Sequence, residues 1–284
     1  MRGDTNIIGY IRFSYFGRSD ARLSRSDKSE LLSKLYDEER MNERFYLFES
    51  ICLPSLRWQS DQDFKIVVLI SPEMPDVFKE RLAKSVADIP QVEILCVSAE
   101  HVTFALNPWI EKQAVVQNHR TAHFRLDDDD AIASHFIENI RATMGGVPDH
   151  TLISLPSGLY LTNDGGEVQL LAKFQPYIAI GLTIINPPGH IANPYQMSHS
   201  QYYRNVPSLM LPNEFAYIHT AHGQSDTLSV QGKRRQQHEE YHAETWANKP
   251  RRFKMAVRRN FGGHGIDHFL KILQRAPSTE AVRP

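Results

Sequence analysis

The sequence predicts an α/β protein with a parallel, right-handed N-terminal half, a mixed second half and a basic helical tail. Strand-like and helix-like segments alternate four times within about the first 145 residues, as they do in parallel sheets covered by helices. Short strand-like runs follow, two of them joined by an Asn-Asp-Gly-Gly turn, which is a strong hairpin signal. The net charge of −1 hides a net of −8 over residues 1–230 and of +7 over 231–284. We therefore expect one domain over 1–230 and a basic, mainly helical extension over 231–284.

In the N-terminal half, apolar spacing predicts strands at 7–13, 64–70, 92–97 and 122–127. The run 64–70 is apolar almost throughout, as a parallel strand buried on both faces is. The polar stretch 18–37 is expected to be a loop with one helical turn. Helices are predicted over 38–59 with a kink or split at Pro54, over 75–87, from Asn107 to about 118, and from Asp130 to the Gly145-Gly146 pair.

In the second half, strands are expected at 151–155, 158–162, 167–174, 177–185 and 214–219. The residues Asn163 to Gly166 form the predicted hairpin turn between two of them. The stretch 186–213 contains Pro-Pro-Gly and Asn-Pro and is predicted to be mainly loop.

The composition is that of an ordinary globular protein, with 41% hydrophobic and 23% charged residues. No run approaches the roughly 18 apolar residues of a membrane span, and the N-terminus lacks an apolar signal core, so a cytoplasmic protein is expected. The acidic body argues against a nucleic-acid partner. Cys52 and Cys96 lie in apolar segments and are expected to be small buried hydrophobes rather than a disulfide.

Four consecutive carboxylates, Asp127 to Asp130, end the predicted strand 122–127. Unpaired carboxylates are costly to bury, so the run needs either solvent or a cation. Divalent Mg²⁺ and Mn²⁺ take such oxygens together with phosphate oxygens, and ligands of open α/β sheets bind at the carboxyl ends of strands. The run therefore indicates a metal–diphosphate site, or else a solvated loop in which Asp130 caps the next helix. Because successive strand residues alternate between faces, at most half of the four should reach one ion.

Four phrases occur in order over about residues 6–230: Ile11-Arg12-Phe13-Ser14-Tyr15, Leu53-Pro54-Ser55-Leu56-Arg57-x-Gln59 with Asp63-Phe64, Phe124-Arg125-Leu126 with the aspartate run and Ala131, and His222-Gly223-x-Ser225-Asp226. With the parallel half and the acidic strand end, they resemble the GT-A-type glycosyltransferases and, more narrowly, the family of putative rhamnosyltransferases. The resemblance implies a GT-A-like mixed sheet. It also implies transfer of a sugar, rhamnose by the family's name, from a nucleotide-diphosphate donor to a carbohydrate or lipid-linked acceptor, as in polysaccharide biosynthesis.

By this resemblance, Asp127, Asp129 and His222 would bind a divalent cation, Mn²⁺ or Mg²⁺, with His219 as a less favoured substitute for His222. Asp128 and Asp130 are the frame-shifted alternative pair and would otherwise contact the donor. The remaining donor-site candidates are Arg12, Ser14 and Arg125. Arg125 could equally serve in a structural ion pair. Phe13 or Tyr15 would either stack on the base or pack in the core.

An inverting transferase needs a base within reach of the acceptor hydroxyl. Asp226, in the last of the four phrases, is the first candidate, and the others are Glu214, Asp164 and His199. Asp164 is also explained as a turn residue. A retaining mechanism would need no such base, and the sequence leaves both mechanisms open.

Three alternatives accompany this interpretation. A nucleotide-sugar-binding protein without turnover would keep the same fold. The pentapeptide His238-Glu239-Glu240-Tyr241-His242 matches the zinc-hydrolase pattern, but its flanks lack the apolar stripe of a packed helix, which argues against a zinc hydrolase. Residues 251–259 mix basic and apolar side chains, so peripheral contact with the inner face of the membrane is an alternative to a solvated basic helix.

Overall fold

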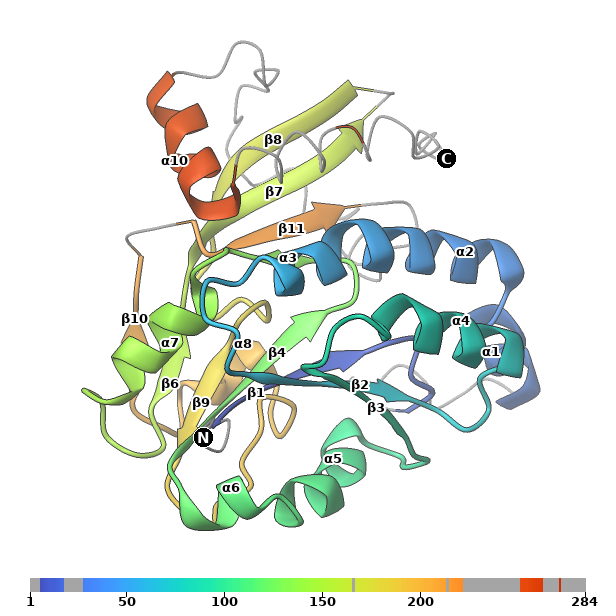
Figure 1. Cartoon of the computed structure of the whole chain (residues 1–284), viewed down its shortest axis with the longest axis horizontal. Helices are drawn as coiled ribbons and strands as arrows, with labels where there is room; N and C mark the ends of the chain where they lie inside the picture. Colours follow the sequence, from blue (N-terminus) through green and yellow to red (C-terminus); the bar gives the residue numbers. More distant parts are fainter. Residues whose placement is uncertain are drawn as a thin grey trace.

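The computed structural model describes residues 6–17, 28–164, 167–212, 215–221, 251–262 and 271. Figure 1 shows a large sheet with helices above and below it and a smaller sheet at the top. The large sheet has the strand order β10-β6-β9-β4-β1-β2-β3. Its strands are β1 (Ile7–Arg12), β2 (Lys65–Ile70), β3 (Val92–Cys96), β4 (Thr121–Asp127), β6 (Leu152–Ser154), β9 (Thr183–Asn186) and β10 (Ser208–Met210). Neighbouring strands are parallel except at β9, which runs antiparallel to β4 and β6. The predicted α/β class and parallel N-terminal half are therefore confirmed.

Both faces of the large sheet are covered by helices (Figure 1). The helices are α2 (Glu38–Leu47), α4 (Asp76–Val86) and α7 (Phe136–Met144) on one face, and α5 (Val102–Glu111) and α6 (Ala114–Asn118) on the other. Along β2, Ile66 and Val68 join the hydrophobic cluster of the first face, whereas Val67 and Leu69 join that of the second. Because strand residues alternate between faces, a strand covered on both sides must be apolar throughout. This requirement explains the unbroken apolar run that predicted β2.

Helix α2 continues through a π-helical turn, η1 (Phe48–Cys52), into α3 (Leu53–Arg57). Pro54 stands at the start of α3, where its missing N–H costs little. In the widened turn before it, the Leu53 N–H donates to the Phe48 carbonyl. The predicted effect of Pro54 thus takes the form of a local change in winding. Ahead of α2, the structure contains α1 (Lys28–Leu35), which is longer than the single helical turn expected within 18–37.

The smaller sheet has the order β5-β11-β7-β8. Its strands are β5 (Ala131–Ile132), β7 (Ser157–Asp164), β8 (Glu167–Phe174) and β11 (Tyr217–Ala221). The β7–β8 pair is antiparallel with Asp164 opposite Glu167, which confirms the predicted hairpin. The antiparallel-containing second half is confirmed as well.

One face of the smaller sheet is apolar and is covered by α10 (Arg251–Phe261), which lies beside β7 and β8 in Figure 1. Val257 and Phe261 of α10 pack with Leu159 and Leu170 of the sheet, and the Ser134 N–H donates to the Asn260 carbonyl at 2.7 Å. Among the described residues, no helix is both long enough and apolar enough to span a bilayer.

Four expectations are wrong in detail. Asp130 does not cap a helix, because β5 follows it and His135 is the N-cap residue of α7. Helix α5 begins at Val102 rather than Asn107, and Pro108 lies inside it, since the buried apolar face of α5 outweighs the local preference of Pro. Cys96 is exposed, because β3 is an edge strand. The strand expected at 177–185 is confined to β9, since Tyr177 and Gly181 adopt positive φ, which ends a strand.

Candidate active site

A cavity of about 440 Å³ opens between the two sheets, at the carboxyl ends of β1 and β4. Sequence reasoning had placed the ligand site at this edge of a parallel sheet. The described residues that line it include all four aspartates of the run and five cations. The cations are Arg12, Arg40, Arg44, Arg125 and Lys173. A site with this lining can hold a strongly anionic ligand together with a metal ion.

Strand register brings Arg12 and Asp127 together. The two residues are partners in the parallel pairing of β1 with β4, and the Arg12 Nη2 atom lies 3.9 Å from Asp127 Oδ1. Arg125 Nη2 donates to the same oxygen at 3.0 Å. Burial alone would raise the pKa of Asp127, but the two guanidinium groups outweigh burial and hold this pKa below its ordinary value. Asp127 is therefore an ionised carboxylate at neutral pH.

The aspartate run leaves the strand at Asp127 and forms a turn, in which the Asp130 N–H donates to the Asp127 carbonyl at 3.2 Å. Strand alternation does not govern residues within a turn, so all four residues line the cavity. That at most two of the four carboxylates reach one ion stays a prediction.

Arg44 of α2 contacts two members of the run. Its Nη2 atom lies 3.2 Å from Asp128 Oδ1 and its Nη1 atom 2.7 Å from Asp129 Oδ2. Asp128 is 1% exposed, and burial raises its pKa to about 6 even though Arg44 opposes the shift. Helix α2 thereby fixes the middle of the run.

Asp130 joins the run to the smaller sheet. The Thr220 N–H of β11 donates to Asp130 Oδ1 at 2.9 Å, and the Thr220 hydroxyl donates to the Asp129 carbonyl. Burial, followed by the charges of Asp129 and Asp127, raises the pKa of Asp130 well above its ordinary value. Asp130 is thus a structural acceptor for the β11 backbone, a role that sequence reasoning did not anticipate.

Lys173 of β8 and His219 of β11 also line the cavity. The Lys173 Nζ atom lies 2.7 Å from His219 Nδ1 and 5.2 Å from the centroid of the Tyr160 ring. Burial lowers the pKa of Lys173 to about 8, against the effect of Asp130. The sequence signal for Lys173 is weak, since a single Lys in a strand is normally a solvent-facing residue.

Arg40 and Arg44 could not be assigned to the site from the sequence, for a different reason. They stand four residues apart on α2, and therefore on one helix face, but the target of that face depends on tertiary packing. Arg40 Nη1 donates to Ser14 Oγ at 3.1 Å. Ser14 follows β1 and has a φ of 45°, a left-handed conformation that is uncommon for a non-glycine residue.

Tyr195 lines the cavity, as Tyr15 also does. The guanidinium carbon atoms of Arg12 and Arg125 lie 5.4 and 4.7 Å from the centroid of its ring. Phe13 is fully buried between Phe45 and Phe48, so it packs in the core and does not stack on a base.

Several predicted residues lie outside the described part of the chain. They are Glu214, His222, Asp226 and the His238, Glu239 and His242 triplet. Of the other base candidates, Asp164 stands at the β7–β8 hairpin, whereas His199 lines the cavity. The roles assigned to Asp226, Glu214 and His222 stay predictions.

A divalent cation fits the residues that are present. No group of three or more His, Cys, Asp or Glu side chains is positioned as a metal cage within the described segments. The side chains of Asp127 and Asp129 keep 29% and 13% exposure, and Asp128 Oδ2 is buried with no hydrogen-bond partner. One or two carboxylates are enough for a hard ion such as Mg²⁺ that also takes diphosphate oxygens. Asp127 and Asp129 could therefore contribute ligands to such an ion.

Several solved structures are similar to the chain at low sequence identity. TarS 1–349 of S. aureus has 12% identity and a TM-score of 0.42, and the match covers 76% of this chain and 60% of TarS. Its complex with UDP-GlcNAc has 14% identity and a TM-score of 0.41, with coverage of 79% and 61%. A glucose-1-phosphate thymidylyltransferase homologue from Bacillus anthracis has 9% identity and a TM-score of 0.38, with coverage of 72% and 87%. The chain thus spans about three fifths of the solved TarS 1–349 chain.

A comparison with curated protein sequences gives no match. The family model described as "Putative rhamnosyl transferase" matches residues 6–234. This range contains both sheets and every described residue of the cavity. The chain belongs to the putative rhamnosyl transferase family.

Proposed function

We propose that the protein is a metal-dependent glycosyltransferase that moves a sugar, rhamnose by the family's name, from a nucleotide-diphosphate donor to an acceptor hydroxyl. The observation that carries the proposal is the aspartate run at the end of β4, which lines one cavity together with five cations. Departure of a nucleoside diphosphate develops negative charge, and fixed cations stabilise such charge most strongly inside a cavity. The arrangement provides cations for the phosphates and carboxylates for a metal.

Asp127 and Asp129 would hold the divalent ion, with His222 as the third protein ligand. When bound, the ion supplies Lewis-acid stabilisation of the diphosphate. Arg12 and Arg125 orient Asp127 and flank Tyr195, so a donor phosphate in this region meets guanidinium donors that are already in place. Arg44 and Lys173, which also line the cavity, supply further positive charge.

The first test is a donor screen by titration calorimetry, with dTDP-rhamnose, UDP-GlcNAc and free dTDP, each with and without Mn²⁺. We expect the preferred donor to bind at least tenfold more tightly with Mn²⁺ and to lose this gain in Asp127→Asn and Asp129→Asn. Asp88→Asn is the matched control, because Asp88 is an exposed aspartate that follows α4, pairs with Arg57 and does not line the cavity. Equal binding with and without metal for every donor would refute the metal role.

The second test separates a transferase from a binding protein of the same fold. Wild-type protein is incubated with the bound donor and Mn²⁺, and nucleoside diphosphate release is measured by chromatography. Metal-dependent release that is lost in Asp129→Asn is expected of the enzyme. Tight binding without release for all donors would favour the nonenzymatic alternative.

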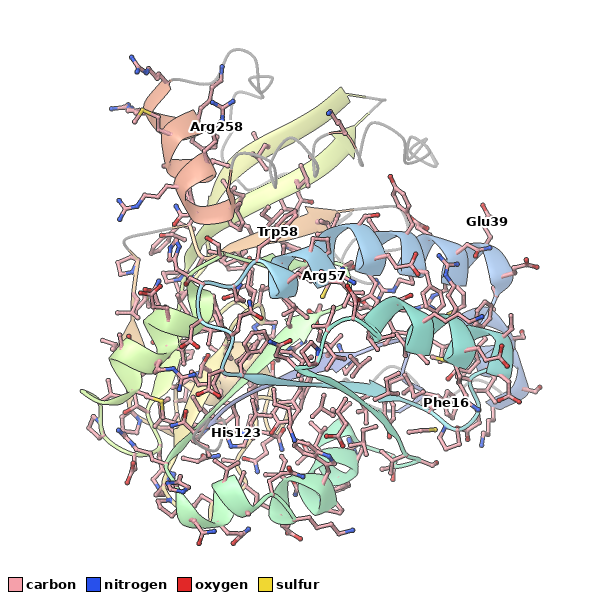
Figure 2. The ribbon with its side chains drawn as sticks, viewed as in Figure 1. Phe16, Glu39, Arg57, Trp58, His123 and Arg258 are labelled. Carbon is pink, nitrogen blue, oxygen red and sulfur yellow. The ribbon has the colours of Figure 1, made fainter. Side chains whose placement is uncertain are left out.

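The exposed face of α10 supports a peripheral membrane contact and a lipid-linked acceptor. Val257 and Phe261 are buried, whereas Arg251, Arg258 and Met255 are exposed, and Arg258 projects outward from the helix in Figure 2. Basic residues around an exposed apolar side chain favour the surface of anionic bilayers. We expect co-sedimentation with vesicles containing phosphatidylglycerol, and its loss in Arg251→Glu/Arg258→Glu. The control Lys84→Glu/Lys112→Glu reverses two exposed charges elsewhere, and an equal loss in the control would refute a specific role for α10.

A further inference from the structure

His199 is the first residue of α8 (His199–Tyr202) and lines the cavity that also contains the aspartate run. Its Nδ1 atom lies 2.8 Å from the Tyr177 carbonyl oxygen. A carbonyl oxygen can only accept a hydrogen bond, so Nδ1 must carry the proton and Nε2 must present a lone pair. Among the residues that the structure describes, no hydrogen bond engages Nε2.

The Tyr177 carbonyl is held in place by an unusual backbone. Tyr177 has a φ of 55°, a left-handed conformation that bulky residues rarely adopt and that persists only where the surroundings impose it. Its N–H donates to Ser154 Oγ at 2.9 Å, and its ring stacks on Tyr203 with centroids 4.3 Å apart and planes 14° apart. Tyr203 directly follows α8. The ring stack and the His199 hydrogen bond therefore both connect Tyr177 to α8 and the residue after it.

His219 is the second histidine among the described residues that line the cavity, and it has the opposite tautomer. His219 Nδ1 lies 2.7 Å from Lys173 Nζ, and a lysine ammonium can only donate. Nδ1 of His219 is therefore the acceptor, and its proton is on Nε2. Of the two histidines, His199 is prepared to accept a proton at Nε2 and His219 is not.

We propose that His199 Nε2 is the general base of the transfer reaction, an assignment that rests on the proposed glycosyltransferase function. The acceptor O–H bond breaks and its proton passes to Nε2, while the acceptor oxygen forms a bond to the anomeric carbon of the donor. The bond from that carbon to the diphosphate oxygen breaks, and the nucleoside diphosphate leaves with the electron pair. A single displacement of this kind inverts the configuration at the anomeric carbon.

The test compares wild type with His199→Gln and His199→Ala, using dTDP-rhamnose and Mn²⁺ with water as the acceptor. Loss of a general base typically lowers the rate by about 10²- to 10⁴-fold, so dTDP release should fall at least 100-fold while donor affinity stays within twofold. Azide has no proton to lose, so adding it should restore dTDP release in the variants and yield a rhamnosyl azide of inverted configuration. His101→Gln, an exposed histidine outside the cavity, should behave as wild type.

Unchanged hydrolysis in both His199 variants, failure of azide to restore release, or an azide product of retained configuration would each overturn the assignment. The tautomer provides a check that needs no donor. In ¹⁵N NMR spectra of the full chain, His199 should show a protonated Nδ1 and an unprotonated Nε2, and the reverse pattern would also overturn the assignment. If wild type neither binds nor hydrolyses any donor, the proposed function fails instead, and the NMR result still decides whether the His199 geometry is correct.

Discussion

Arg44 bridges Asp128 and Asp129, with nitrogen–oxygen separations of 3.2 and 2.7 Å. The side chains of Arg44 and Asp128 are only 14% and 2% exposed, so removing the guanidinium leaves carboxylate charge buried without its counter-ion. Loss of one partner from such a pair typically destabilises a protein by several kcal/mol. We expect Arg44→Ala to lower the free energy of unfolding by about 2–4 kcal/mol, measured by urea denaturation, and to weaken donor binding at least tenfold.

The double variant Arg44→Ala/Asp128→Asn tests the cause of this loss. Neutralising Asp128 removes part of the uncompensated charge, so stability should partly recover, and the coupling energy follows from the mutant cycle. Arg57→Ala is the control, because Arg57 forms its pair with Asp88 on the exposed surface and such pairs contribute about 0–1 kcal/mol; Figure 2 labels this residue. Equal destabilisation by Arg44→Ala and Arg57→Ala would contradict the buried bridge.

The sheet and the position of the aspartate run were predictable because both depend on local patterns. An apolar run such as 66–70 fits a strand covered on both faces, and the carboxylates follow another strand directly. The predictions failed where packing overrides local preference. Helix α5 continues past Pro108 because its apolar face is buried. Asp130 accepts a hydrogen bond from the β11 backbone and does not cap a helix.

The cations of the site could not be derived from sequence in the same way. Arg44 is 85 residues from Asp129 in the chain, and Lys173 is 46 residues from His219. Convergence of these residues depends on how α2 and the smaller sheet pack against β4, and no local spacing encodes that packing. The wider lesson is that a strand end can be located from sequence, whereas the opposite walls of its cavity require coordinates.

Lys173 should contribute a positive charge to donor binding. Lys173→Met keeps most of the apolar stem and removes the charge, and hydrogen bonds to charged groups contribute about 1.5–3 kcal/mol. We therefore expect donor affinity, measured by calorimetry at pH 7, to fall about 10- to 100-fold. The matched control is Lys112→Met, an exposed lysine outside the cavity. An unchanged affinity in Lys173→Met would show that its ammonium does not face the donor.

The same lysine predicts an alkaline limit to donor binding. Burial lowers the pKa of Lys173 to about 8, so the side chain is cationic below this pH and loses its charge as the pH rises through it. Donor affinity should therefore decrease between pH 7 and 9. Lys173→Arg, which stays charged in this range, should remove most of the decrease. A wild-type affinity that is constant up to pH 9 would contradict this expectation.

Gly158 leaves space for Tyr217 within the smaller sheet. A Cβ atom at position 158 would overlap the Tyr217 ring, which is 1% exposed and donates through its hydroxyl to the Pro156 carbonyl at 3.1 Å. Overpacking of this type typically costs about 1–3 kcal/mol, and Gly158→Ala should lower the free energy of unfolding accordingly. Because Gly158 is the register partner of Lys173, donor affinity should fall as well.

Gly145→Ala is the matched control for Gly158→Ala. Position 145 has a φ of −68°, and no heavy atom lies within 4 Å of a Cβ built there. An alanine is compatible with this backbone and reduces the entropy of the unfolded chain, so stability should stay the same or rise slightly. If both variants lose the same stability, steric overlap with Tyr217 is not the cause.

His123 should make the protein sensitive to acid. It is fully buried in β4 between the Tyr10 hydroxyl, 2.6 Å from Nδ1, and the Thr121 hydroxyl, 2.8 Å from Nε2, and Figure 2 labels it near the base of the strand. Burial lowers the pKa of His123 from 6.5 to about 3. Between these pH values the unfolded chain binds a proton at His123 that the folded protein does not. The contribution of His123 to the free energy of unfolding is therefore fully present above about pH 6.5 and is lost as the pH falls.

The expected contribution of His123 is a slope in the free energy of unfolding that approaches about 1.4 kcal/mol per pH unit between pH 6 and 4. Asp128 acts in the opposite direction, because its raised pKa makes the folded protein bind the extra proton. The measurement is therefore a difference: urea unfolding of wild type and His123→Gln across this range, with Asp128→Asn as the companion variant. Replacing His123 should flatten the acid slope, whereas replacing Asp128 should steepen it, since the two substitutions remove proton linkages of opposite sign. Parallel slopes for wild type and His123→Gln would show that the imidazole does not remain neutral in the folded protein.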